Sequence, residues 1–192
     1  MREHILVVAA TERELATPNG WYTLCCGVGP VEAAAATAAA IAVHRPAAVL
    51  HVGIAGARRE SGIEPPSLVI GDSAVYCDLH VPESWAPHNI PSPPRLVAAA
   101  RRALPAAIVR AIGTSARVGG TTASHTQCEV EAMEGFGVLR AAQLAGIPAL
   151  EVRAISNHVE EENRTRWRFD DALAAITAAT LLLVAELSSC VD

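Results

Sequence analysis

Carboxylates and other polar side chains gather late in the chain. Glu131 and Glu134 stand three residues apart, a spacing that places two side chains on one face of a helix. Arg153, Ser156 and Asn157 follow at the end of an apolar run. Buried polar groups need hydrogen-bond partners, and such partners at the end of a strand usually mark a binding site. Together the two groups favour a ligand site over solvated surface charge.

The hydrophobic pattern predicts the elements that must position these residues. Apolar runs bounded by turn residues predict strands over residues 5–9, 21–26, 48–52, 68–70, 74–76, 108–112 and 149–155. Segments with an apolar face predict helices over residues 31–44, 95–104, 129–145 and 169–187. Five prolines predict an irregular segment over residues 82–94. Because strand and helix alternate, we predict a single α/β domain over residues 1–192, with three α/β/α layers around a mixed, mostly parallel sheet.

Three of the predicted strands end in residues that suit a ligand site. Glu14 follows the first strand, the turn from Gly53 to Gly56 follows the third, and Asn157 ends the last one. Ligands in such folds bind at the carboxyl ends of the strands. We therefore expect these three segments to meet around one site.

The composition excludes several classes of function. Of the 192 residues, 51% are apolar and 18% are charged, and the formal charge is −5. Basic residues form only short pairs such as Arg58-Arg59, which excludes a nucleic-acid partner. The longest uncharged runs, residues 33–43 and 172–185, are too short to span a bilayer. We expect a protein that acts on small molecules away from membranes.

The sequence gives no sign of a metal or a cofactor. The five cysteines include no CxxC pair, which indicates reduced thiols in the cytoplasm and neither disulfides nor a zinc site. The motif Gly27-Val-Gly-Pro-Val-Glu32 lacks the third glycine of a dinucleotide fingerprint, and no P-loop occurs. We expect no metal, because no ligand spacing links His80, His88, His125 and His158.

Several fragments, in their order and spacing, resemble the superfamily of nucleoside phosphorylases and nucleosidases. They are Ala9-Ala-Thr-x-x-Glu14, Cys26-Gly-Val-Gly-Pro-Val-Glu32, Val52-Gly-Ile-Ala-Gly56, Glu131-Ala-Met-Glu-Gly135, Val152-Arg-Ala-Ile-Ser-Asn157, Glu160, Asn163-Arg164 and Trp167. Within the superfamily, the chain is most similar to the futalosine hydrolases of the alternative menaquinone pathway. The resemblance covers most of the chain, and it implies the fold of that superfamily and a homo-oligomer, a dimer or larger.

The resemblance implies cleavage of the N-glycosidic bond of a purine nucleoside. That reaction passes through a ribosyl cation, so it needs a firmly held ribose, a stabilised leaving base and a positioned water. By family position, Glu134 binds the ribose hydroxyls and Met133 packs against the sugar. Glu14 activates the water. Glu12 is the alternative, because the segment after residue 14 is shorter than in relatives.

The same resemblance places Asn157, held by Ser156, against the purine. Related adenosine-type nucleosidases carry aspartate at this position. An amide has a donor end for O6 of hypoxanthine and an acceptor end for a protonated N7. A mismatched base leaves buried polar groups unpaired, at about 1–3 kcal/mol each. Asn157 therefore favours a 6-oxopurine nucleoside such as futalosine as the small-molecule partner.

The family positions predict further contacts with the substrate. We expect the nucleoside to be lined by Ala55, Gly56, Thr121, Thr122 and Trp167, with Phe169 as the alternative to Trp167. A cation should hold the benzoate end of futalosine, and the candidates are Arg58, Arg164 and Arg166.

Three functions stay open on the sequence alone. The first is hydrolysis of futalosine to hypoxanthine and dehypoxanthine futalosine. The second is a methylthioadenosine/S-adenosylhomocysteine nucleosidase, or another purine nucleosidase or phosphorylase. Ala132 stands where the methylthioadenosine branch has glutamate, and a phosphorylase needs more cations than Arg13 beside the expected site. The third is a nucleoside-binding protein without catalysis.

Overall fold

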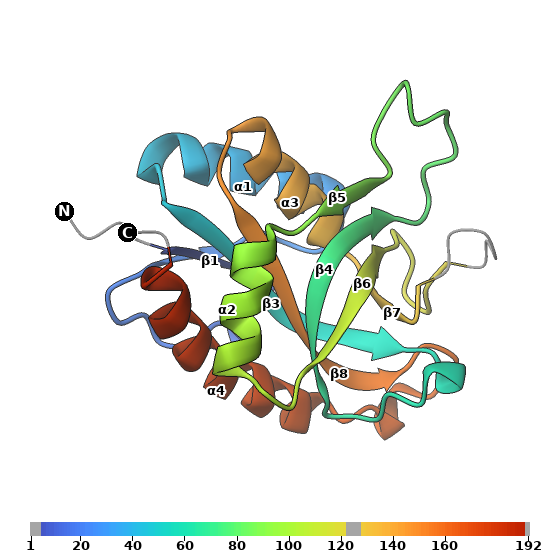
Figure 1. The fold of residues 1–192 in the computed structure, drawn as a ribbon. Coiled ribbons are helices and arrows are strands. Elements are labelled where there is room, and N and C mark those ends of the chain that lie inside the picture. Colours follow the sequence, from blue (N-terminus) through green and yellow to red (C-terminus); the bar gives the residue numbers. More distant parts are fainter. Residues whose placement is uncertain (1–4, 122–127, 191–192) are drawn as a thin grey trace.

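The computed structural model describes residues 5–121 and 128–190. Its described part has one sheet of eight strands: β1 Ile5–Ala9, β2 Tyr22–Cys25, β3 Ala48–Ala57, β4 Leu68–Tyr76, β5 Asn89–Pro91, β6 Ile108–Thr114, β7 Val130–Ala132 and β8 Ala149–His158. The α-helices of the same residues are α1 Pro30–His44, α2 Pro94–Ala103, α3 Gly135–Leu144 and α4 Phe169–Ser188 (Figure 1). The α/β class predicted from the sequence is confirmed.

The sheet is mixed and closes on itself. Its strand order is β2-β1-β3-β7-β6-β4-β5, and β8 pairs with both β3 and β4. The strands β3, β7, β6, β4 and β8 therefore form a closed ring, with β1 and β2 extending from β3. Five of the eight pairings among the described strands are parallel, as predicted. Because β1, β3 and β8 are parallel, their carboxyl ends lie at one edge of the sheet.

Helices cover the sheet on two sides, which gives the three predicted layers (Figure 1). On one side, alternate residues of β1, β3 and β8, such as Val7, Leu50 and Val152, pack against α2 and α4. On the other side, Leu6 and Val49 pack toward α1 and α3. Strands with apolar residues on both faces read as continuous apolar runs, which explains why β1 and β3 were visible in the sequence. A third apolar cluster draws its members from the five strands of the ring and from Ile63 in the segment before β4.

The predicted helix over residues 129–145 begins too early. Residues Val130–Ala132 form β7 instead, and α3 begins only at Gly135. In this strand Val130 pairs with Ile112 of β6, and Glu131 pairs with Gly56 of β3. Backbone hydrogen bonds to two neighbouring strands outweigh the local preference for helix. Glu131 and Glu134 therefore do not share a helical face, and Glu134 is the residue that precedes the first turn of α3.

Other boundaries shift without changing the order of elements. The strands predicted over 68–70 and 74–76 are one strand, β4, which continues through an irregularity between Gly71 and Ser73. The strands predicted over 48–52 and 149–155 extend to Ala57 and His158. The proline-rich segment contains the short strand β5. These extensions carry β3 and β8 directly into the site.

Helix α4 is long and apolar enough to cross a membrane, judged by its length and composition. In the fold, its residues Ala172, Ile176, Leu183 and Leu187 are buried in the cluster shared with α2 and the sheet. Such burial is typical of the core helix of a folded domain. It also explains the length of the uncharged run at this end of the sequence.

Candidate active site

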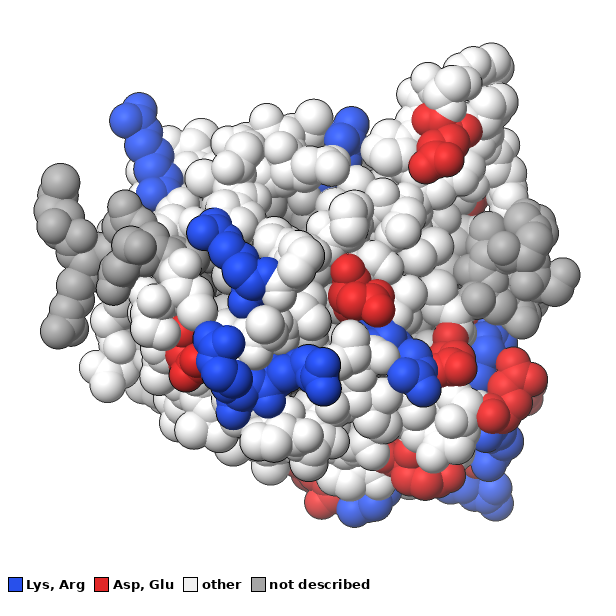
Figure 2. Space-filling model, viewed as in Figure 1, with Lys and Arg blue, Asp and Glu red and all other residues white. Residues whose placement is uncertain are grey.

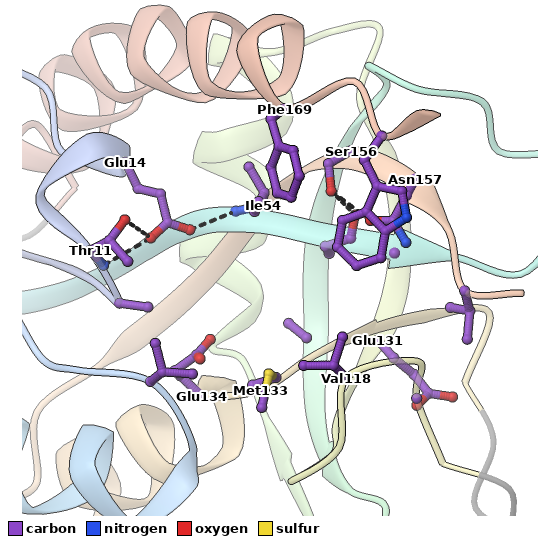
Figure 3. A pocket seen from close by; sticks show the side chains of 18 of the residues that line it. Thr11, Glu14, Ile54, Val118, Glu131, Met133, Glu134, Ser156, Asn157 and Phe169 are labelled. Carbon is purple, nitrogen blue, oxygen red and sulfur yellow. Dashed lines mark hydrogen bonds between the residues drawn. The ribbon is translucent and has the colours of Figure 1, made fainter. Parts of the chain in front are cut away.

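A cavity of about 310 Å³ lies at the carboxyl ends of β1, β3 and β8. Figure 3 shows Glu14 and Glu134 at one end of it and Ser156 with Asn157 at the other, while Phe169 faces Met133 and Val118 across the space. The three strand ends named from the sequence do meet here. The lining residues are Ala10, Thr11, Arg13, Glu14, Val28, Ile54, Ala55, Gly56, Arg117, Val118, Gly119, Gly120, Glu131, Ala132, Met133, Glu134, Ser156, Asn157, Val159, Trp167, Phe169 and Leu173.

Glu14 is held rigidly at the edge of the cavity. It ends a short 3₁₀ turn after β1, and its side chain is 4% exposed. Its Oε2 accepts hydrogen bonds from the backbone N of Thr11 at 2.9 Å and from the Thr11 hydroxyl at 2.8 Å, while its Oε1 accepts from the backbone N of Ile54 at 3.0 Å (Figure 3). These three donors fix a carboxylate whose remaining lone pairs are available to a water in the cavity.

Glu134 faces the cavity from the start of α3. Its Oε1 accepts from the backbone N of Gly29 at 3.2 Å, and its Oε2 accepts from Arg153 Nη2 at 3.2 Å. The side chain is 4% exposed. Because the two oxygens are tied to different elements, the carboxylate is fixed in orientation.

Arg153 lies behind the two cavity carboxylates and forms an ion pair with one of them, Glu134. It is 1% exposed and projects from the middle of β8. A Cβ placed on Gly53 would overlap Arg153 Nη1 and lie 2.7 Å from Glu14 Oε1, so the glycine lets these two side chains lie against the backbone of β3. Burial lowers the pKa of Arg153, but Glu151, Glu134 and Glu14 outweigh it, and the net shift is upward. Arg153 is a permanent cation at this site.

Two further titratable groups lie behind Arg153, outside the cavity. Glu151 and His51 are both 0% exposed. Arg153 Nε donates to Glu151 Oε1 at 2.8 Å, and a ring nitrogen of His51 lies 3.1 Å from Arg153 Nη2. Burial, and then the charge of Arg153, hold the pKa of His51 well below its usual value. Burial raises the pKa of Glu151. The positive charge of Arg153 lowers this pKa, the negative charge of Glu134 raises it further, and the net shift is upward.

Ser156 and Asn157 form the polar part of the opposite end. The Ser156 hydroxyl donates to Asn157 Oδ1 at 2.7 Å, and Asn157 Nδ2 donates to the backbone O of His158 at 2.8 Å. Each end of the amide thus has one fixed partner and keeps one further site, a lone pair on Oδ1 and an N–H on Nδ2. Asn157 is 8% exposed, so only a small part of it is open to the cavity.

The structure brings together most of the residues predicted for the substrate. The cavity is lined by Glu14, Ala55, Gly56, Met133, Glu134, Ser156, Asn157 and Trp167. Trp167 lies beside Phe169, with ring centroids 5.2 Å apart, and both line the space. Glu12 is exposed and lies outside the lining. Thr121 is buried next to the lining but is not part of it, and Thr122 lies outside the described residues.

The arginines suggested for the substrate tail lie elsewhere. Arg58 is buried in an ion pair with Glu131, and its Nη2 also donates to the backbone O of Thr121 at 2.9 Å. Neither Arg164 nor Arg166 lines the cavity. The arginines that do are Arg13 and Arg117.

Sequence reasoning missed the residues behind the cavity. Glu151 and His51 each interrupt an apolar strand. A titratable residue inside an apolar run was the sequence feature that could have identified them as buried functional residues. The pair of Arg58 and Glu131 had no local signal, because 73 positions separate its members. Within residues 5–121 and 128–190, no three His, Cys, Asp or Glu side chains are grouped as a metal site would require.

Comparison with known proteins assigns the family. A sequence profile of the Phosphorylase superfamily matches residues 21–189. The futalosine hydrolase of Streptomyces coelicolor is 38% identical over 90% of this chain and 82% of its own length. The futalosine hydrolase of Thermus thermophilus is 30% identical over 88% of this chain and 83% of its own length. The chain belongs to the futalosine hydrolase family, within the Phosphorylase superfamily.

A solved structure agrees with this assignment at the level of the fold. The methylthioadenosine/S-adenosylhomocysteine nucleosidase of Colwellia psychrerythraea, solved in complex with adenine, superposes with a TM-score of 0.83 at 18% identity. The match covers 97% of this chain and 96% of that one. The futalosine hydrolase family and this nucleosidase therefore share one fold.

His51 predicts how the stability of this family member depends on pH. Its pKa is below 6.5 in the folded protein, so below pH 6.5 the unfolded chain binds a proton that the folded chain does not. We expect the free energy of unfolding of the wild type to fall, relative to His51→Gln, by roughly 1.4 kcal/mol for each pH unit below 6.5. Urea unfolding at pH 7.5, 6.5 and 5.5 measures this, and parallel curves for the two proteins would contradict it.

Proposed function

We propose that the chain hydrolyses the N-glycosidic bond of futalosine, releasing hypoxanthine and dehypoxanthine futalosine in menaquinone biosynthesis. One observation carries this proposal: two fixed carboxylates, Glu14 and Glu134, share one end of a cavity whose other end carries Asn157. This is the set of groups that cleavage of a 6-oxopurine nucleoside requires. The 38% identity to a futalosine hydrolase supports the substrate.

In this proposal, Glu134 and Met133 contact the ribose. A ribosyl cation develops positive charge at the sugar, and a carboxylate fixed nearby stabilises that charge without having to reorganise. Glu134 is fixed by Gly29 and Arg153, and its oxygens can accept hydrogen bonds from ribose hydroxyls. Met133 gives the sugar an apolar wall.

In this proposal, Glu14 binds and activates the water. Its side chain is oriented by Thr11 and Ile54 before any ligand arrives, so a water bound to it is placed as well as deprotonated during attack. Glu14 lines the cavity, whereas Glu12 is exposed outside it. This geometry supports Glu14 as the base and leaves Glu12 without a role.

Asn157 serves the purine. The Ser156 hydroxyl fixes its Oδ1 and the His158 carbonyl fixes its Nδ2, so the amide cannot turn over freely. The remaining N–H suits O6 of hypoxanthine, and the remaining lone pair suits a protonated N7. Ala55, Gly56 and Trp167 complete the space around the base.

The charges around Glu14 support hydrolysis over phosphorolysis. A bound phosphate needs arginines that are not already neutralised. Arg13 pairs with Asp170 at 3.3 Å, and Arg153 lies among carboxylates behind the cavity. Among the described residues, Arg117 alone of the lining arginines has no ion-pair partner, which suits the single carboxylate at the benzoate end of futalosine.

A nucleosidase for methylthioadenosine or S-adenosylhomocysteine is the second candidate. The close structural likeness to such an enzyme in complex with adenine favours it. Asn157 argues against it, because adenine presents a donor amino group where hypoxanthine presents O6. A nucleoside-binding protein without turnover is the third candidate, and the fixed carboxylate of Glu14 argues against that.

We propose the setting of the reaction as well. The chain acts as one nucleosidase domain in the cytoplasm, without a metal or cofactor, and as a homo-oligomer. Figure 2 shows arginines interspersed with acidic side chains on the face that it presents, which supports a small-molecule partner over nucleic acid. Val28 and Val118 are 57% and 52% exposed beside the cavity, which supports a partner subunit there.

The proposed reaction is tested with purified protein, futalosine, inosine and methylthioadenosine, each with and without phosphate. We expect hypoxanthine from futalosine at a rate that phosphate does not change. Chromatography of the released base measures this. Adenine released from methylthioadenosine alone would establish the second candidate, dependence on phosphate would indicate a phosphorylase, and no base from any nucleoside would favour a binding protein.

Glu14 and Glu12 form a matched pair for testing the base. Glu14→Gln removes the carboxylate that faces the cavity, so we expect kcat for futalosine to fall by about 100-fold or more. Glu12→Gln makes the same chemical change two residues away, outside the cavity, and should leave kcat within about twofold. Initial rates of hypoxanthine release measure kcat for both variants. A larger loss of kcat in Glu12→Gln than in Glu14→Gln would assign the role of general base to Glu12.

Asn157 is tested by changing its donor end. In Asn157→Asp an oxygen faces the His158 carbonyl at the present 2.8 Å, so this carboxyl group is favoured in its protonated form. We expect kcat/KM for futalosine to fall by about 10- to 100-fold, since one mismatched hydrogen bond costs about 1–3 kcal/mol, and relative turnover of methylthioadenosine to rise. An unchanged ratio between the two substrates would show that Asn157 does not read the base.

A further inference from the structure

Glu151 is a charged side chain that the proposed reaction does not use. It lies in the middle of β8, is 0% exposed and is not part of the cavity lining. Its Oε1 accepts from Arg153 Nε at 2.8 Å. Its Oε2 is buried and has no hydrogen-bond partner among the described residues. Burying a carboxylate with one oxygen unsatisfied is costly, so its position calls for a physical reason.

The start of α3 makes room for this carboxylate. A Cβ on Gly135 would overlap the carboxylate of Glu151, so a residue other than glycine would displace that carboxylate. The groups that face Glu151 are Arg153 on its own strand, His51 on β3 at 3.7 Å, and Glu134, whose charge raises the pKa of Glu151. Glu134, which faces the cavity, directly precedes the glycine that admits Glu151.

Arg153 has more possible acceptors than one orientation can satisfy. A guanidinium carries five N–H donors in one plane, and a fork of two of them fits a single carboxylate. Without Glu151, the guanidinium can turn toward Glu134 and Glu14 and neutralise them, since both already lie on its cavity side. With Glu151 holding Nε, only Nη2 reaches Glu134, and Nη1 points to the backbone O of Ile54 at 3.4 Å.

We propose that Glu151 is a positioning residue for cleavage of the glycosidic bond: it holds Arg153 so that the guanidinium orients Glu134 through Nη2 alone and forms no ion pair with Glu14. This rests on the proposed function of the cavity. Glu151 touches neither substrate nor water and acts only through Arg153. Its effect falls on the transition state, where a full negative charge must meet the ribosyl cation, and not on binding of the neutral purine.

The test compares Glu151→Gln with the wild type. Glutamine keeps an acceptor oxygen for Arg153 Nε but removes the charge that competes with Glu134 and Glu14 for the guanidinium. We expect kcat for futalosine to fall by about 10- to 100-fold, the effect of a small misplacement of catalytic groups. KM for futalosine should change by less than about twofold, because the contacts with the base are unaffected. For the same reason, the dissociation constant of hypoxanthine, measured by calorimetry, should also change by less than about twofold.

Two further variants separate positioning from folding. Gly135→Ala displaces the Glu151 carboxylate while keeping its charge, and we expect a kcat loss of the same order. Val152→Ala is the matched control: Val152 is the next residue on β8, equally buried, and points to the opposite face toward α2 and α4. It should lower the melting temperature and leave kcat within about twofold.

The results of these measurements test the positioning role of Glu151 separately from the proposed function. Unchanged kcat in Glu151→Gln, with an active wild type, overturns the positioning role and leaves the function intact. A fall in kcat that matches the fall in Val152→Ala at equal loss of melting temperature also overturns it. If the wild type cleaves another nucleoside instead of futalosine, the same comparison is made on that nucleoside. If it cleaves none, both proposals fall.

Discussion

The shape of the site depends on one buried cation, Arg153. Taking a guanidinium out of water costs several kcal/mol, and nearby charges must offset that cost. Here Glu151 lies 2.8 Å from Nε and Glu134 lies 3.2 Å from Nη2, and Glu14 approaches from across Gly53. These partners come from β8, the start of α3 and the turn after β1. Arg153 therefore ties β8 to the start of α3 through ion pairs, and moving either partner leaves a buried charge unpaired.

The closed ring of strands gives this cation its surroundings. Because β8 pairs with both β3 and β4, its middle has no open edge, and Arg153, which projects from it, is 1% exposed. The same closure brings β7 against the end of β3, so that Gly56 and Glu131 become neighbours. Met133 and Glu134 follow directly, and α3 begins at Gly135. The sheet thus positions both ends of the cavity, because β7 leads into Met133 and Glu134, and β8 carries Ser156 and Asn157.

Local sequence patterns predicted most of the elements in their order, because a strand buried on both faces has a continuous apolar run, but they ended β3 and β8 too early. These patterns did not predict β7, whose three residues form a strand because they pair with β3 and β6, which lie far away in the sequence. The candidate residues Glu14, Glu134 and Asn157 were predicted through a resemblance to a family, and the fold brings them to one cavity. Arg58 and Glu131 were not found as a pair, because a contact between residues 73 positions apart leaves no local pattern. His51 and Glu151 were visible as titratable residues inside apolar runs, but only the fold shows that both face Arg153.

The balance of buried charge links structure to the choice of reaction. The cavity carboxylates Glu14 and Glu134 and the buried Glu151 all raise the pKa of one arginine, so carboxyl groups outnumber cations around Arg153. An arriving ribosyl cation reduces that imbalance, and a fixed, water-poor environment strengthens the attraction. An arriving phosphate increases the imbalance. An arrangement that favours a cation therefore also disfavours an anion such as phosphate, which agrees with the proposed role of Glu14 in holding a water.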